Sequence, residues 1–295
     1  MRPPRSISKT VTTLKNRNLT AFFSALSLAS LLSPLMAHAD ETLDKIQQRH
    51  KISVGVMVSG LPFGTLDPKT GAPIGYNVEL AQGVAKGLGV DVELVPVLAP
   101  SRVQFLQQGK VDILIANMNL TPDRSKILDH VPTPYEEIAA AALMRTGSGI
   151  KTWEDLRGKP VCVSQGSNFI TWLRGTYGAE IKAFRSQAES LLSLRGNGCV
   201  AAVHVSPTML ALLNKPEWAD YEIPLEPDRE PLKSVIWLRK GSPDAQARID
   251  AIVRDWHRSG WLIEVGERND LPPSAGIRAL HEKLKTRRPS LRSKP

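Results

Sequence analysis

The chain contains 295 residues, of which 42% are hydrophobic, and this is enough for one large domain or two of ordinary size. Its formal net charge of +9 would suggest a polyanionic partner, but residues 1–39 carry +5 and residues 277–295 carry +6, which leaves −2 for residues 40–276. The folded body is therefore close to neutral, and nucleic-acid binding has little support.

Residues 1–39 have the pattern of a secretory signal peptide. Five basic residues and no acid precede the apolar run "LTAFFSALSLASLL", which is too short to span a bilayer, and the small residues Ala37 and Ala39 follow it. We predict cleavage before Asp40 and export to the periplasm. There is no cysteine near the cleavage site, so a lipid anchor is not expected. No later segment is apolar for long enough to cross a membrane, and we therefore expect a soluble monomer.

Residues 40–144 are predicted to form a first α/β lobe. Short β-rich runs alternate with amphipathic stretches, which favours βαβ units and a mostly parallel sheet. The apolar run "EEIAAAALMRT" then leads out of this lobe. The predicted strands are 51–58, 90–97 and 111–116, and the predicted helices are 75–89 and 101–109.

Residues 145–235 repeat the pattern and predict a second α/β lobe. A further strand is expected at 232–240, and it leads from this lobe into a return segment, 236–270, that ends in two amphipathic helices. Trp256 and Trp261 lie on the apolar faces of these helices and are interpreted as core residues. Residues 271–295 are expected to be a flexible basic tail. In the second lobe we predict helices at 152–158, 168–178 and 186–198 and strands at 159–166, 179–184 and 199–205.

Cys162 and Cys199 are the only cysteines. They lie 37 residues apart with no histidine at ligand spacing, so a metal site is not expected. In an oxidising compartment the two could form a core disulfide, and two buried thiols are the alternative.

The segment "IANMNLTPDR", residues 115–124, raises the question of a cation at a helix start. Thr121 suits the N-cap, Pro122 the first helical position and Asp123 the helix dipole, whereas Arg124 opposes the dipole by roughly 0.3–1 kcal/mol. An anion would offset this cost. A solvated arginine that leans away from the helix end is the alternative.

Two lobes would enclose a cleft, since ligands of open α/β sheets lie outside the carboxyl ends of the strands. "IANMNLTPDR" follows the predicted strand 111–116, and "SQGSN", residues 164–168, ends a strand of the second lobe. Both segments should face the cleft, where Arg124 could pair with a ligand carboxylate.

Four segments resemble the amino-acid-type family of periplasmic solute-binding proteins that serve ABC importers. They are "LPFG…TGAPIGYNVELAQGVAKGLGV", "SRVQFLQQGKVDILIANMNLTPDRSKILDHVPTPY", "WEDLRGKPVCVSQGSN" and "AESLLSLRGNGCVAAVHVSP", and the likeness extends from about Lys51 to Asp270. The resemblance implies a two-lobed, type II periplasmic-binding fold whose lobes are joined by hinge strands and close on a ligand. It also implies an inner-membrane ABC permease as partner and no cofactor.

The resemblance assigns ligand contacts to several residues. Arg124 takes the position of the arginine that pairs with the ligand α-carboxylate, and Asn117 and Asn119 take neighbouring positions whose backbone or side-chain groups complete that site. Ser167 and Asn168 fall where the second lobe supplies donors. Arg102 matches an arginine that meets a second carboxylate in acidic-amino-acid binders, although a surface arginine is the alternative.

Three positions depart from the family pattern. In relatives, two acids pair with the ligand ammonium. Their positions hold Met57 and Ser206 here, or Val205 in place of Ser206 if the register slips by one residue. A third position, where an aromatic lid is common, holds Gly60. An unpaired buried ammonium costs several kcal/mol, so the usual pose of an α-amino acid is disfavoured. Glu136, Glu137 or carbonyl groups could substitute, the ligand could lack an α-amine, or Met57 and Ser206 could line an unchanged site.

The leading hypothesis is a periplasmic substrate-binding protein that binds an amino acid or a related small carboxylate and performs no catalysis. An enzyme on the same fold, such as a dehydratase, is one alternative, with His204 at a strand end as its candidate acid or base. A ligand sensor is another. His204 is more simply interpreted as a core or rim residue.

Overall fold

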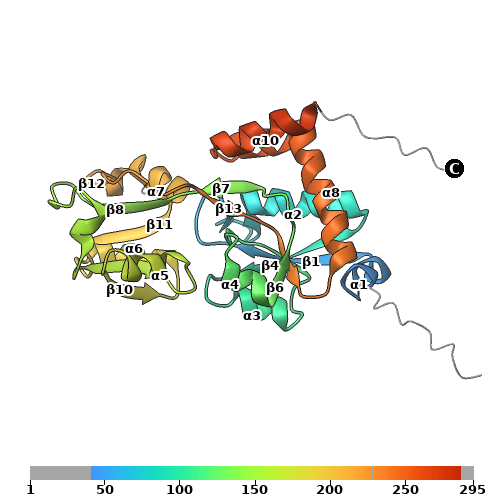
Figure 1. Cartoon of the computed structure of the whole chain (residues 1–295), viewed down its shortest axis with the longest axis horizontal. Coiled ribbons are helices and arrows are strands. Elements are labelled where there is room, and N and C mark those ends of the chain that lie inside the picture. The colour runs from blue at the N-terminus through green and yellow to red at the C-terminus, as the bar shows by residue number, and fades with distance from the viewer. Residues whose placement is uncertain (1–40, 228, 287–295) are drawn as a thin grey trace, which may run out of the picture. The chain divides into compact units, whose positions relative to one another are not determined.

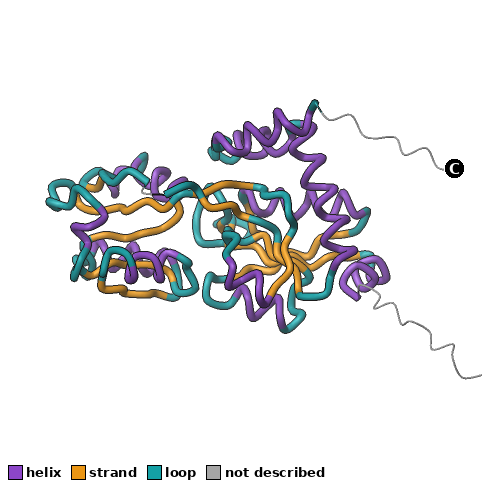
Figure 2. Tube along the Cα trace, in the orientation of Figure 1, coloured by secondary structure: helices purple, strands orange, loops and turns teal. Residues whose placement is uncertain are grey.

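The structure is a computed structural model that describes residues 41–227 and 229–286. The predicted signal peptide lies outside these residues. Two five-stranded sheets, each flanked by helices, form two lobes (Figures 1 and 2). The two-lobed α/β prediction is therefore confirmed. Within the described residues, no helix has the length and apolar character needed to span a membrane.

The first sheet has the strand order β4-β1-β5-β14-β6. β1 runs parallel to β4 and β5, and β14 is antiparallel to β5 and β6. The side chains of β5 are all buried, as expected for a central strand covered on both faces. The strands are β1 (Lys51–Met57), β4 (Asp91–Val97), β5 (Ile113–Ile115), β6 (Leu128–His130) and β14 (Trp237–Arg239).

Helices from both ends of the described chain cover this sheet. α2 ends at Gly89, whose φ of 71° provides a left-handed C-cap. α8 packs against α2. Trp256 and Trp261 contact each other with tilted rings whose centroids are 4.9 Å apart, and both join the core, as predicted. The elements are α1 (Glu41–Arg49), α2 (Tyr76–Leu88), α3 (Arg102–Gln107), α4 (Pro122–Ile127), α8 (Pro243–Ser259), α9 (Trp261–Arg268) and the hairpin of β2 (Thr65–Leu66) and β3 (Pro73–Ile74).

The second sheet has the order β10-β9-β11-β8-β12. β9 is parallel to β10 and β11, and β8 is antiparallel to β11 and β12. The strands are β8 (Ala140–Arg145), β9 (Pro160–Ser164), β10 (Glu180–Phe184), β11 (Ala201–Val205) and β12 (Tyr221–Glu222). The helices are α5 (Phe169–Gly175), α6 (Gln187–Arg195), α7 (Ser206–Leu213) and the 3-10 turns η1 (Trp153–Leu156) and η2 (Pro216–Trp218).

Two antiparallel strands, β7 (Glu136–Ile138) and β13 (Leu232–Ser234), link the two sheets (Figure 1). β8 already belongs to the second sheet, so the chain leaves the first lobe near residue 139 rather than at 144 as expected. The single strand expected at 232–240 is two strands, β13 and β14, because the chain there passes from the link into the first sheet.

The expectation of a flexible tail from residue 271 is not met between residues 275 and 285, which form α10 (Ala275–Lys285) packed against α8. Ser274 caps this helix by accepting a hydrogen bond from the Ile277 amide, and Ile277 and Leu284 are buried. The apolar residues of this helix recur at helical spacing between its basic residues, so one face packs on the core while the charges stay in solvent. Residues 287–295 lie outside the described part.

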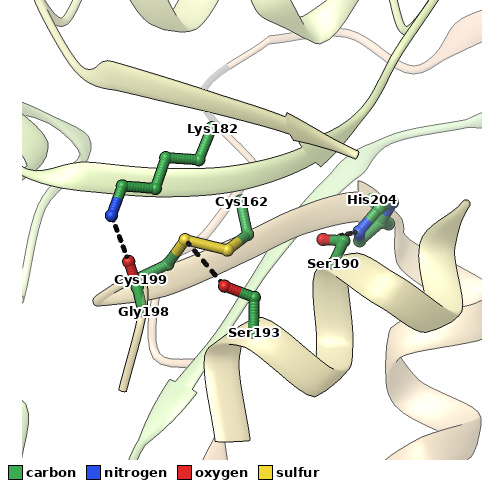
Figure 3. The surroundings of a disulfide bond; sticks show 7 residues. All are labelled: Cys162, Lys182, Ser190, Ser193, Gly198, Cys199 and His204. Atoms are coloured by element: carbon green, nitrogen blue, oxygen red, sulfur yellow. Dashed lines mark hydrogen bonds between the residues drawn. A yellow bond between two sulfur atoms is a disulfide. The ribbon is translucent and has the colours of Figure 1, made fainter. Parts of the chain in front are cut away.

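Cys162 and Cys199 form a disulfide in the core of the second lobe (Figure 3). It ties β9 to the residue two positions before β11, and the two Cα atoms are 5.8 Å apart. Of the two alternatives that the sequence left open, the disulfide is therefore the one observed.

Candidate functional site

A cleft lies between the two lobes where β1, β5, β9 and β11 end. Its empty space is about 610 Å³, open solvent at the mouth included, which suits a small molecule. Both lobes contribute side chains, as expected from the carboxyl-end rule. The lining residues are Met57, Ser59, Leu98, Ala99, Arg102, Asn117, Asn119, Ser164, Ser167, Asn168, Phe169, Arg185, Ser186, Gln187, His204, Val205 and Thr208.

Arg102 is the deepest cation of the cleft. It is the first residue of α3 and is only 4% exposed. Its Nη1 donates to the carbonyls of Ala116 at 2.8 Å and Asn117 at 3.3 Å, and its Nη2 donates to the Gly166 carbonyl at 3.2 Å. Burial lowers the pKa of its guanidinium to about 9, and the nearby charge of Arg124 adds to the effect. The alternative of a surface arginine is wrong.

Arg124 also donates a hydrogen bond to the Gly166 carbonyl. Thr121 caps α4 as predicted, with its side chain accepting a hydrogen bond from the Arg124 amide at 3.4 Å. The guanidinium turns back from the helix and donates to the Asn119 carbonyl at 2.7 Å and to the Gly166 carbonyl at 3.2 Å. Burial lowers its pKa to about 10. Arg124 itself is not one of the residues that line the cleft.

Asn117 and Asn119 both line the cleft and shape the loop between β5 and α4. Asn117 has a φ of 50°, and its Oδ1 accepts a hydrogen bond from Asn77 at 2.9 Å. Asn119 donates through Nδ2 to the carbonyl of Leu232 in the link between lobes. Their backbone carbonyls serve the arginines, so the loop holds both guanidiniums in place.

The second lobe contributes the loop after β9. Ser167 and Asn168 line the cleft, and Ser167 Oγ accepts a hydrogen bond from the Phe169 amide at 3.2 Å. Gly166 has a φ of 73°, and its carbonyl receives both guanidiniums from the first lobe. A side chain at this position would meet the backbone of Ala99 across the cleft.

Met57 ends β1 and lines the cleft, but Ser206 does not. Ser206 starts α7, and its amide donates to the Ala139 carbonyl at 2.9 Å. Val205, the alternative register, is the lining residue at this strand end. The placement of Ser206 in the site is therefore corrected by one residue, because β11 ends at Val205.

His204 and Arg185 are the further titratable residues of the lining. His204 Nε2 lies 2.8 Å from Ser190 Oγ (Figure 3), and burial lowers its pKa to about 3. Arg185 is exposed at the rim and follows β10 directly. From the sequence, His204 was a catalytic candidate and, more simply, a core or rim residue. Arg185 was not predicted, although the rule of strand carboxyl ends points to it. The described residues contain no cluster of side chains suited to a metal ion.

Comparisons with known proteins agree with this architecture. The profile of the bacterial extracellular solute-binding proteins, family 3, matches residues 52–268. The L-cystine-binding protein TcyJ of Escherichia coli (strain K12) is 28% identical over 235 residues, which are 78% of this chain and 86% of that protein.

Two solved structures are similar over most of their length. The cysteine-binding protein of Campylobacter jejuni gives a TM-score of 0.72 at 26% identity, over 77% of this chain and 92% of that one. The ancestral amino acid-binding protein AncCDT-1, a precursor of cyclohexadienyl dehydratase, gives 0.69 at 28% identity, over 77% and 98%. The matched region includes both lobes and the link between them. The chain belongs to family 3 of the bacterial extracellular solute-binding proteins.

Proposed function

We propose that the protein binds a small carboxylate-bearing solute between its two lobes and presents it to an inner-membrane ABC permease from the periplasm. Membership of the family supports this role, as do the names of the relatives, which include an L-cystine-binding and a cysteine-binding protein. The export signal predicted in residues 1–39 fits the same compartment.

One observation carries the proposal, namely that Arg102 and Arg124 of the first lobe both donate to the Gly166 carbonyl of the second. A planar guanidinium pairs best with a carboxylate, which accepts two parallel hydrogen bonds. A ligand carboxylate would take the place of the shared carbonyl. Ser167 and Asn168 would then add donors from the second lobe.

The titratable groups at the cleft favour binding over catalysis. A general acid or base works best when its pKa lies near the working pH. The pKa of His204 is lowered to about 3 by burial, so this residue is poorly suited to proton transfer at neutral pH. The likeness to a dehydratase precursor concerns an amino-acid-binding ancestor.

The test begins with thermal unfolding in the presence of amino acids, their 2-oxo counterparts, dicarboxylates and opines. A ligand at a hundred times its Kd adds about 2.7 kcal/mol of stability, which shifts the Tm by a few degrees. Arg124→Ala should then weaken binding of the best ligand by roughly 3–5 kcal/mol, because a buried charge loses its partner. Lys126→Ala, on the exposed side of the same helix, is the matched control and should bind normally. A loss below about tenfold for Arg124→Ala would contradict its role.

A further inference from the structure

The cleft concentrates positive charge without any matching acid. Arg102 and Arg185 line it, Arg124 shares the Gly166 carbonyl with Arg102, and none of the lining residues is an aspartate or glutamate. Among residues 41–227 and 229–286, none of these three arginines forms an ion pair with a carboxylate. The described acceptors of the Arg102 and Arg124 guanidiniums are backbone carbonyls, which carry no net charge.

Both inner guanidiniums keep their charge at neutral pH. Burial lowers the pKa of Arg102 to about 9 and that of Arg124 to about 10, and both values remain above 7. The two charges also repel each other, as the effect of Arg124 on the pKa of Arg102 indicates. An anion placed between them would relieve this repulsion and give each a charged partner.

Glu189, Asp123 and Glu136, which lie on segments adjoining the cleft, are not available to balance a ligand cation. Glu189 lies beside Arg185, where its Oε2 accepts a hydrogen bond from the Arg185 amide at 3.1 Å, but it does not line the cleft. Asp123 is exposed and pairs with Lys126 at 2.8 Å. Glu136 is buried in the link, and burial raises its pKa to about 8, so that it is mostly protonated at neutral pH.

A ligand ammonium would therefore meet only neutral groups and repelling cations. His204 is neutral at physiological pH, and the remaining polar lining consists of hydroxyl and amide side chains. Met57, Val205 and Phe169 add an apolar wall. Removing an ammonium from water without a charged partner costs several kcal/mol, whereas a carbon skeleton without the amine suits this wall.

We propose that the cleft selects organic anions that lack an α-ammonium group, such as 2-oxo acids, 2-hydroxy acids and simple carboxylic acids, over the α-amino acids with the same carbon skeleton. This inference rests on the proposed function, in which the cleft binds a carboxylate. It names the chemical class of the ligand and follows from the charges of the described residues alone.

Calorimetric titration of the purified wild-type protein with matched pairs tests the inference. Each proteinogenic amino acid is compared with its 2-oxo counterpart, for example L-glutamate with 2-oxoglutarate and L-leucine with 4-methyl-2-oxopentanoate. We expect the amine-free member of a binding pair to bind at least about tenfold more tightly. Equal or tighter binding of the amino acid, lost in Arg102→Ala, would overturn the inference and leave the proposed function intact. If no member of any pair binds, both the inference and the proposed function are overturned.

A gain-of-function variant tests the same point from the opposite side. Val205→Asp places a carboxylate on the cleft wall, so the preference should shift by at least about tenfold toward the amino acid of the pair. Leu210→Asp adds the same charge on α7 at an exposed position outside the lining, and it should keep the wild-type order. Thermal unfolding checks that each variant is folded, and the wild-type comparison decides the question if Val205→Asp does not fold. An unchanged preference in folded Val205→Asp would contradict the inference.

Discussion

Gly166→Ala should weaken ligand binding because Gly166, in the second lobe, contacts Ala99 of the first lobe and accepts hydrogen bonds from Arg102 and Arg124. An ideal Cβ at this position would lie 2.7 Å from the Ala99 carbonyl oxygen and 3.3 Å from the Cα of Pro100. Ordinary contacts need about 3.5 Å, so the lobes would have to separate by roughly 0.8 Å. A carboxylate that has replaced the Gly166 carbonyl on Arg102 and Arg124 would then lie too far from the donors that Ser167 and Asn168 add from the second lobe.

The expected magnitude has two parts that a control can separate. Gly166 has a φ of 73°, so alanine there costs roughly 1–2 kcal/mol of folding stability in any state of the lobes. The clash with the other lobe adds about 1–3 kcal/mol to the state in which the lobes touch, equivalent to a loss in affinity of roughly 5-fold to 150-fold. Gly158→Ala is the matched control, since Gly158 has a φ of 67° and no atom within 4 Å of an added Cβ.

Chemical denaturation and calorimetric titration together provide the assay, with the strongest ligand of the thermal-shift panel as probe. Both variants should lose similar folding stability, and only Gly166→Ala should lose affinity. If Gly166→Ala binds that ligand as tightly as Gly158→Ala, the contact between Gly166 and Ala99 is not part of the ligand-bound state. The reasoning would then be refuted.

Two further predictions concern stability. Burial raises the pKa of Glu136 to about 8 in the folded protein, which therefore keeps a proton that the unfolded chain releases near pH 4.5. The free energy of unfolding should fall as the pH rises between these two values, by up to about 1.4 kcal/mol per pH unit. Glu136→Gln should flatten this pH dependence, as measured by urea denaturation. A variant with the same slope as wild type would rule out a buried protonated Glu136. The disulfide closes a loop of 37 residues, so Cys162→Ala combined with Cys199→Ala should cost about 2–4 kcal/mol, and reductant should destabilise wild type but leave the double variant unchanged.

Strand ends could be predicted from the sequence, and with them most of the cleft. Arg102, Asn117, Asn119, Ser167 and Asn168 all line it, because each follows a strand whose carboxyl end faces the other lobe. Their exact contacts could not be predicted, since the sharing of one carbonyl by two guanidiniums depends on how the lobes meet.

The errors have physical causes of the same kind. Ser206 and Val205 differ by one residue, and a shift of one at a strand end moves a side chain out of the cleft. Arg185 follows β10, but this strand is largely exposed and lacks the buried apolar pattern that marks the other strand ends of the cleft. The pairing of Cys162 with Cys199 could not be decided from the sequence, because sequence spacing does not reveal that their Cα atoms approach to 5.8 Å.

Binding and lobe contact should be coupled, because the same guanidiniums take part in both. Arg102 and Arg124 belong to the first lobe, and Gly166, their shared acceptor, belongs to the second. A neutral carbonyl gives them ordinary hydrogen bonds, whereas a carboxylate bound between them would attract both charges and also accept from Ser167 and Asn168. A ligand can shift a conformational equilibrium only by its difference in affinity for the two states. An anion gains both arginines and the second lobe only when the lobes meet, so the charge of the ligand, more than its size, should drive closure.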